Sequence, residues 1–142
     1  MSDDYSNETR ICNLLYKYLE SEGYVILQLI CPGAQAALSI CYDSPKYNVK
    51  KTIFPDLIAL YRQTIIIGEI KPKFSLADKA KLLDLFNSCN GSSKIKSLIE
   101  RITKKEVQDF HINYVLVHGQ KSSKIDPQIT QIVLTEDNVY MH

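Results

Sequence analysis

The sequence predicts a mixed α/β (α+β) fold in which a single mixed β-sheet is flanked by helices. Segments with helical apolar spacing lie at the start and in the middle of the chain, and strand-like segments precede and follow the middle pair. A length of 142 residues suits one domain that buries its own core. We therefore expect residues 1–142 to form one domain, with the order helix, several strands, two helices and two strands.

The N-terminal region has the spacing of an amphipathic helix. Apolar side chains recur at helical intervals between Ile11 and Leu19, and Gly23 follows them. The pattern predicts a helix over residues 7–22, capped by Ser6 or Asn7.

Strands are predicted next. Residues 24–30 are apolar and rich in branched side chains, Pro32 and Gly33 interrupt the pattern, and residues 37–42 resume it. Residues 43–51 predict a polar loop.

Two later runs, residues 53–61 and 64–71, are strand-like and only two residues apart, which predicts a β-hairpin. If the hairpin closes symmetrically about those two residues, Asp56 lies directly opposite Glu69.

Two helices and two strands are predicted after the hairpin. Pro72 ends the last strand, and Ser75 with Asp78 three residues later has the spacing of a helix N-terminus. The helices are expected over residues 75–88 and 94–105, and the strands over residues 113–118 and 129–135. The side chains expected to face inward are Leu76, Ala80, Leu83 and Phe86 in the first helix and Ile95, Leu98, Ile99 and Ile102 in the second, with Asn90 and Gly91 ending the first.

Charge is unevenly distributed along a chain whose formal net charge is only +1. Residues 1–45 carry two basic and six acidic side chains, residues 46–105 carry thirteen and five, and residues 106–142 carry two and five. A basic centre in a neutral protein favours a local face that binds a polyanion. Lysines that simply cover solvated helix faces are the equally weighted alternative.

The cysteines and the termini bear on location. The four cysteines show no CxxC spacing, so we expect unpaired thiols rather than a zinc site, although Cys31 and Cys41 flank a turn and could approach each other. The N-terminus is acidic where a signal peptide would be basic, and polar residues interrupt the longest uncharged stretch. These features predict a cytoplasmic protein without a transmembrane segment.

The predicted hairpin concentrates charge at one end. Two opposed carboxylates repel each other unless a cation neutralises them, and oxygen ligands of this kind suit Mg²⁺, with Mn²⁺ as a substitute. Lys71 lies two residues after Glu69 and therefore projects from the same face of the strand. Two carboxylates, a divalent cation and an ammonium group suit phosphodiester hydrolysis. The alternative is a strand-entry turn at Asp56 and a solvated pair at Glu69 and Lys71.

The residues Pro55-Asp56 and Glu69-Ile70-Lys71 resemble the signature of the PD-(D/E)XK nuclease superfamily. The resemblance implies a restriction-endonuclease-like αβββαβ core, which the predicted elements match from about residue 7 to residue 118. It also implies that Asp56, Glu69 and the carbonyl of Ile70 bind Mg²⁺ and that Asp56, Glu69 and Lys71 are catalytic. Many members add an acid from the first helix, for which Glu8 is the best match, with a purely helix-stabilising role equally weighted.

The hypothesis is therefore a Mg²⁺-dependent DNA endonuclease, with RNA left open as a substrate and a homodimer left open as the assembly. Holliday-junction resolvase activity is the leading variant. Two other classes remain: a catalytically silent nucleic-acid-binding or assembly module of the same fold, and an unrelated α/β interaction protein. The side chains expected to contact phosphates are Lys46, Lys50, Lys51, Lys73 and Lys79.

Overall fold

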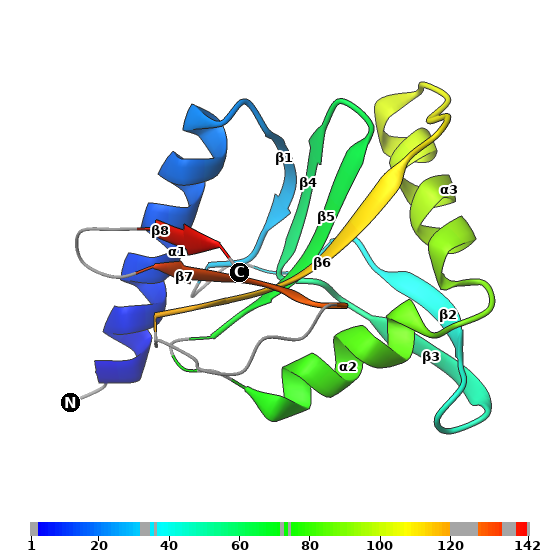
Figure 1. Ribbon diagram of the computed structural model, residues 1–142, viewed down its shortest axis with the longest axis horizontal. Coiled ribbons are helices and arrows are strands. Elements are labelled where there is room, and N and C mark those ends of the chain that lie inside the picture. Colours follow the sequence, from blue (N-terminus) through cyan, green and yellow to red (C-terminus); the bar gives the residue numbers. More distant parts are fainter. Residues whose placement is uncertain are drawn as a thin grey trace.

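The protein is a mixed α/β domain built on a mixed sheet flanked by helices (Figure 1). The computed structural model describes residues 3–31, 35, 37–71, 73, 75–119, 128–134 and 139–141. The elements in this part of the chain are α1 (Asp3–Ser21), β1 (Val25–Leu29), β2 (Ile40–Ser44), β3 (Val49–Ile53), β4 (Leu57–Tyr61), β5 (Thr64–Ile70), α2 (Leu76–Phe86), α3 (Gly91–Thr103), β6 (His111–His118), β7 (Thr130–Leu134) and β8 (Val139–Met141).

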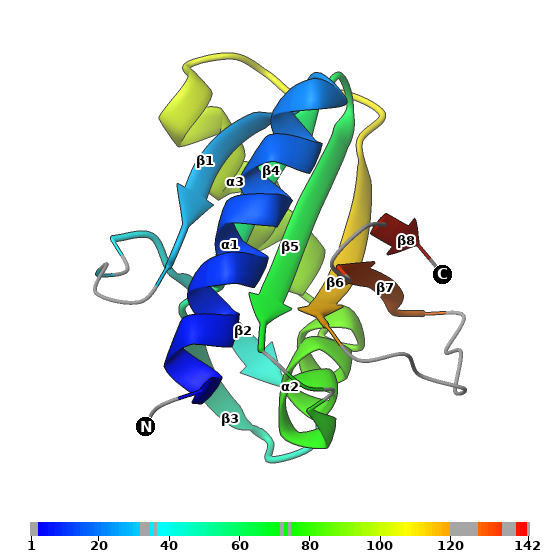
Figure 2. The ribbon, with the colours of Figure 1, turned by 90° about the vertical axis from the view of Figure 1, so that its left-hand side faces the viewer.

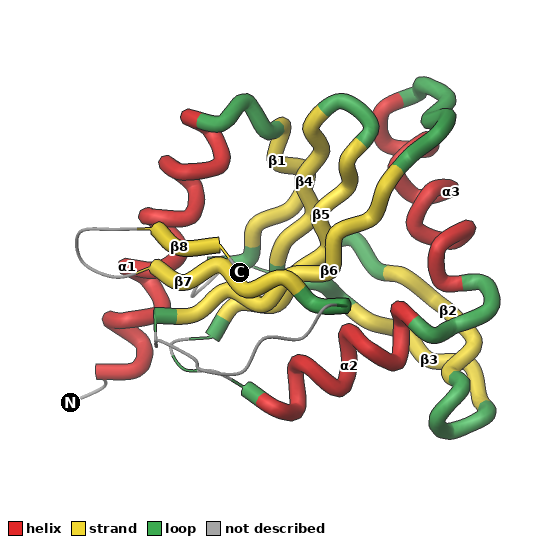
Figure 3. The backbone as a smooth tube through the Cα atoms, viewed as in Figure 1, coloured by secondary structure: helices red, strands yellow, loops and turns green. Residues whose placement is uncertain are grey.

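The main sheet has the strand order β1-β4-β5-β6-β7-β8. Strands β1, β4 and β5 are antiparallel neighbours, whereas β6 runs parallel to β5 and to β7. The parallel step from β5 to β6 requires a crossover, which α2 and α3 supply. Strands β2 and β3 form a separate two-stranded sheet beside α2 and α3, as the backbone tube shows (Figure 3).

The central strands are buried on both faces, so the sheet has two cores. Figure 2 shows α1 lying across one face, where its apolar side chains pack against alternate residues of β4 to β7. The opposite face packs against α2, α3 and the β2–β3 hairpin. Burial on both faces explains why β5 reads as a continuous apolar run from Ile65 to Ile67 rather than an alternating one.

The β4–β5 hairpin has the predicted register. Tyr61 pairs with Thr64 and Leu57 with Gly68, so the turn is formed by Arg62 and Gln63. Arg62 adopts a left-handed backbone conformation with φ 54°, as tight hairpin turns require.

The prediction of a polar loop over residues 43–51 is wrong. Most of this segment belongs to the β2–β3 hairpin, in which Tyr42 pairs with Lys51 and Ser44 with Val49. Inward side chains of β2 alternate with solvated ones, while most of β3 is exposed, so the composition looks like that of a loop. Asn48 supplies the left-handed residue of the turn, with φ 53°.

The two middle helices are present, but the inward face predicted for the first is wrong. In α2 the buried side chains are Asp78, Leu82, Asp84 and Leu85, whereas Leu76 and Phe86 are exposed. Hydrophobic spacing alone predicts the wrong face, because two of the side chains that this helix buries are the acids Asp78 and Asp84. In α3, Ile95, Leu98 and Ile99 are buried as predicted.

The boundary between these helices also differs from the prediction. Asn90 and Gly91 begin α3 instead of ending α2, which stops at Phe86 with Asn87 as its cap. A Cβ atom on Gly91 would lie 2.6 Å from the carbonyl oxygen of Leu85, so this close approach requires glycine. Ser75 caps α2 as expected, because its hydroxyl oxygen accepts a hydrogen bond from the Asp78 N–H at 3.1 Å.

Helix α1 begins earlier than predicted, at Asp3, so Ser6 and Asn7 lie within the helix and not at its cap. Acidic residues in the first turn favour this extension, because they interact well with the positive end of the helix dipole.

A disulfide joins Cys12 of α1 to Cys31 after β1, so the prediction that these thiols are unpaired is wrong. Their Cα atoms are 5.7 Å apart, whereas Cys41 and Cys89 are free. None of the helices in the described part of the chain has the length and apolar character needed to cross a membrane.

Candidate functional site

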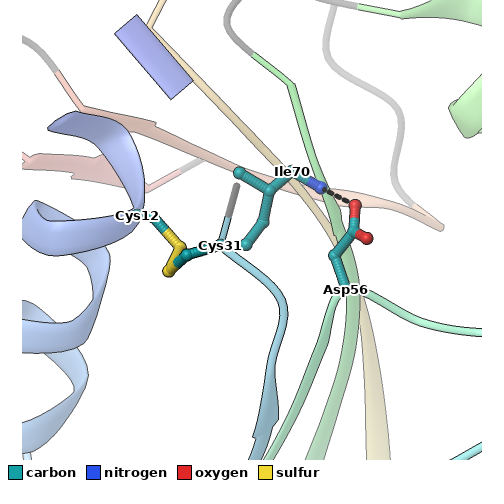
Figure 4. The surroundings of a disulfide bond; sticks show 4 residues. All are labelled: Cys12, Cys31, Asp56 and Ile70. Atoms are coloured by element: carbon teal, nitrogen blue, oxygen red, sulfur yellow. Dashed lines mark hydrogen bonds between the residues drawn. A yellow bond between two sulfur atoms is a disulfide. The ribbon is translucent and has the colours of Figure 1, made fainter. Parts of the chain in front are cut away.

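Two carboxylates meet where β4 begins and β5 ends. The Asp56 N–H donates a hydrogen bond to Glu69 Oε2 at 3.2 Å. The Ile70 N–H donates to Asp56 Oδ2 at 3.0 Å, as Figure 4 shows. Each acid therefore accepts a backbone hydrogen bond from the other strand. The expected approach of Asp56 and Glu69 follows from the hairpin register, which continues one step beyond the last paired residues, Leu57 and Gly68.

Glu69 is the more deeply placed acid, with 3% of its surface exposed. Burial, followed by the charge of Asp56, raises the pKa of Glu69 to about 7, although the ammonium of Lys81 opposes the shift. A carboxylate of this kind changes protonation near neutral pH and gains from any cation that approaches it.

Lys81 and Asp78, which the sequence did not indicate as site residues, complete this region. Lys81 Nζ lies 2.9 Å from Glu69 Oε1 and 3.6 Å from Asp78 Oδ1. Burial lowers the pKa of Lys81, but its contacts with Glu69 and Asp78 raise it more, so the net shift is upward. Asp78 is 5% exposed, and its Oδ2 atom has no hydrogen-bond partner among the described residues. The signal that could have found them is the Asp78–Lys81 spacing of three on one helix face.

The other predicted site residues are less closely associated. The Lys71 N–H donates to the Val117 carbonyl at 2.9 Å and its side chain is exposed. In the described residues no hydrogen bond or ion pair joins the Lys71 ammonium to Asp56 or Glu69. Glu8 is half-buried on α1 and is not grouped with the two acids. The catalytic role of Lys71 and the metal-binding role of Glu8 stay predictions.

The disulfide lies on the α1 side of this region. Figure 4 shows Cys12 and Cys31 close to Ile70, whose N–H binds Asp56. Ile70 and Cys12 are both almost fully buried and belong to the same apolar core. The cross-link therefore fixes α1 and the end of β1 beside the strand end that carries the acids.

The donor set fits a hard divalent cation. Mg²⁺ needs only one or two carboxylates when water and substrate oxygens supply its other ligands. Asp56 and Glu69 provide two such groups, and Glu69 Oε1 lies 2.9 Å from the Lys81 ammonium. No group of three or more His, Cys, Asp or Glu side chains suited to a metal occurs within the described ranges. The carbonyl of Ile70 and solvent would have to complete the coordination.

The lysines predicted to contact phosphates divide between surfaces. Lys46 and Lys51 line a cleft of about 570 Å³ between the β2–β3 hairpin and α2, which Lys81 also lines. Lys50 points to the other face of the hairpin, into a recess with Lys94. Lys73 is exposed after β5, and Lys79 is half-buried on α2. Two of the five lysines therefore share this cleft with Lys81, the lysine that contacts Glu69.

Comparison with protein-family models, with curated proteins and with solved structures finds no match to this chain.

Proposed function

We propose that the protein is a metal-dependent DNA endonuclease that hydrolyses phosphodiester bonds at Asp56 and Glu69. The observation that carries the proposal is the pair of carboxylates held against each other at the end of a buried hairpin, with Glu69 3% exposed. Two acids kept this close gain little in stability, because burial and repulsion both disfavour the charged form of Glu69. A site that binds a cation explains their arrangement.

The order of the elements supports a restriction-endonuclease-like core. The PD-(D/E)XK resemblance implies a helix, a three-stranded meander, a helix and a further strand. Helix α1, strands β1, β4 and β5, the α2–α3 crossover and strand β6 follow this order, with the β2–β3 hairpin as an addition. Asp56 and Glu69 occupy equivalent ends of the second and third strands of that meander.

The proposed chemistry assigns a role to each side chain. Asp56, Glu69 and the Ile70 carbonyl would hold Mg²⁺ or Mn²⁺, which when bound lowers the pKa of water and stabilises charge on a phosphate. Glu69 must lose its proton to act as a ligand, so its raised pKa makes metal binding tighten as the pH rises through about 7. Lys71 would orient the nucleophile or stabilise the phosphate. Lys81 would act as the counter-charge that holds Glu69 in place before the cation binds.

The test is cleavage of supercoiled, single-stranded and four-way-junction DNA in the presence of Mg²⁺ or Mn²⁺, with an EDTA control. We expect Glu69→Ala and Lys71→Ala each to lower the cleavage rate by at least about 100-fold, the loss typical of a removed electrostatic or acid–base group. Lys71→Ala should leave Mn²⁺ affinity, measured by calorimetry, unchanged, whereas Glu69→Ala should abolish it. Preference for the junction would identify a resolvase.

Two results would contradict parts of the proposal. If Lys71→Ala cleaves at the wild-type rate and Lys81→Ala does not, the catalytic ammonium is that of Lys81. If the wild-type protein binds DNA but cleaves none of these substrates with either metal, the endonuclease assignment fails and the silent binding module replaces it.

A further inference from the structure

The cleft between the β2–β3 hairpin and α2 lies next to the two acids, although neither acid lines it. Lys81 lines the cleft and also contacts Glu69 at 2.9 Å. On the hairpin side, Phe54 lines the cleft and is followed after one residue by Asp56. Two residues of the cleft lining are therefore neighbours of the carboxylates, Lys81 in space and Phe54 along the chain. The cleft volume of about 570 Å³ is in the range of sites that enclose a small ligand.

Positive charge is concentrated and held in position along the cleft. The Lys51 ammonium lies 3.9 Å, and that of Lys46 5.2 Å, from the centroid of the Tyr47 ring. Cation–π contact restrains both side chains, although their charges repel each other. Lys81 also lines the cleft, but its ammonium is paired with Glu69 and Asp78. The two ammonium groups held beside Tyr47 attract the phosphates of a nucleic-acid backbone.

The acid that lines the cleft does not cancel this charge by direct pairing. Asp84 accepts hydrogen bonds from the hydroxyls of Tyr42 and Ser44, each at 2.7 Å, and from the Lys46 N–H at 3.2 Å. These contacts use both carboxylate oxygens and fix the hairpin turn on α2. Asp84 thus holds the backbone of Lys46 in place, and the charge of Lys51 acts on it without a direct ion pair among the described residues.

An apolar surface accompanies the charges. Phe54 is 53% exposed although phenylalanine is normally buried, and Ala77 and Ala80 of α2 also line the cleft. An exposed aromatic ring beside cations is the arrangement with which proteins stack bases and bind phosphates together.

We propose that this cleft binds a single-stranded segment of DNA, with a base stacked on Phe54 and the backbone phosphates on Lys46 and Lys51. The proposal rests on the nuclease function proposed above and specifies its substrate. Inside a duplex both faces of each base are already stacked on neighbouring bases, so Phe54 can stack on a base without the cost of unstacking only where the strand is unpaired or ends. The substrate is therefore a single strand or an unpaired end, and the unpaired strand is guided from the cleft to Asp56 and Glu69.

Binding can be measured without cleavage, by fluorescence anisotropy of a labelled twelve-nucleotide thymidine oligomer in EDTA. We expect tighter binding of this oligomer than of a duplex of the same length. Phe54→Ala should weaken binding by roughly 5- to 100-fold, the range for loss of one stacked base. Lys51→Ala should reduce the slope of log affinity against log salt by about 0.7, the value for one phosphate contact on a single strand.

Matched variants separate these effects from general loss of charge or aromatic surface. Tyr16→Ala removes a ring of similar exposure on α1, and Lys96→Ala removes an ammonium that lies over the Phe110 ring, 5.6 Å from its centroid. Neither residue lines the cleft. Both variants should bind the oligomer as the wild type does, and circular dichroism checks that every variant is folded.

The outcomes separate this proposal from the nuclease function. Equal affinity for duplex and single strand, or wild-type binding by folded Phe54→Ala, would overturn the cleft assignment even if metal-dependent cleavage is found. Tighter binding of a uridine RNA oligomer than of the DNA oligomer would overturn the choice of DNA. Single-strand preference that depends on Phe54 and Lys51 would support the cleft even if no cleavage occurs, and the nuclease function alone would then fail.

Discussion

Asp84 and Glu69 are both buried acids on the same side of the protein, but their surroundings differ. Asp84 accepts three hydrogen bonds, from two hydroxyls and one backbone N–H, and these contacts hold its pKa below the ordinary value although burial acts in the opposite direction. Glu69 faces Asp56, and the donors that contact its oxygens within the described part of the chain are the Asp56 N–H and the Lys81 ammonium. Burial and the Asp56 charge raise its pKa to about 7.

The difference distinguishes an acid that stabilises the fold from one that costs stability. Hydrogen-bond donors stabilise the charged form of a buried carboxylate. A second carboxylate beside it destabilises that form and lowers the stability of the fold. Asp84 attaches the β2–β3 hairpin to α2, which is a structural task. The contacts of Glu69 do not offset its burial in this way, and a buried acid with a raised pKa is the pattern expected of a functional group.

The largest expected effect is that of Asp84→Ala. The substitution leaves the hydroxyls of Tyr42 and Ser44 without their acceptor inside the protein. We expect the free energy of unfolding at pH 7 to fall by about 2–4 kcal/mol, since unsatisfied buried donors cost about 1–3 kcal/mol each. Urea denaturation measures the change, and Asp84→Asn, which keeps one acceptor oxygen, should lose less. A loss below about 1 kcal/mol for the alanine variant would show that Asp84 is not a structural anchor.

Glu69→Gln should have the opposite sign and a smaller magnitude. Because the pKa of Glu69 rises from its ordinary 4.5 to about 7 on folding, its contribution to stability is full below about pH 4.5 and is lost as the pH rises through 7. The neutral glutamine removes this loss. We expect the variant to exceed the wild type by about 1–2 kcal/mol in unfolding free energy at pH 8 and to match it near pH 5.

Urea denaturation across this pH range provides the measurement, and Asp84→Asn is the contrasting control, because the pKa of Asp84 is shifted downward. An unfolding free energy for Glu69→Gln that is lower than that of the wild type by the same amount at pH 5 and pH 8 would show that the charged carboxylate is not destabilising.

The sequence predicted the elements that hydrophobic pattern determines. The β4–β5 hairpin, its register and the approach of Asp56 to Glu69 followed from two apolar runs separated by two residues. The β2–β3 hairpin did not, because its largely solvated surface gives the composition of a loop. The inward face of α2 was missed because hydrophobic spacing cannot indicate that Asp78 and Asp84 are buried.

Contacts between segments that are distant in the sequence could not be predicted from local sequence patterns. Cys12 and Cys31 approach because α1 packs beside the end of β1, and nothing in their spacing of 19 residues indicates this. The contact of Lys81 with Glu69 likewise depends on how α2 docks after the turn. The position of Lys71, two residues after Glu69 on one strand, predicts that its ammonium lies near the acids. Strand spacing alone cannot indicate that α2 places the Lys81 ammonium beside the same carboxylate.

The smallest effect on stability is expected for Lys81→Met. This variant also tests most directly how the surroundings of Glu69 differ from those of Asp84. The Lys81 side chain is 53% exposed, so removal of its ion pair should change the free energy of unfolding by less than about 1 kcal/mol. The pKa of Glu69 should nevertheless move further upward, because Lys81 is the cation that opposes the effects of burial and of Asp56. Titration of the Glu69 carboxyl carbon by NMR measures this shift, with Lys96→Met as a control that removes a distant lysine. If the Glu69 pKa is the same in both variants, Lys81 does not stabilise the charged form of this carboxylate in solution, and the backbone N–H of Asp56 is the donor that remains to do so.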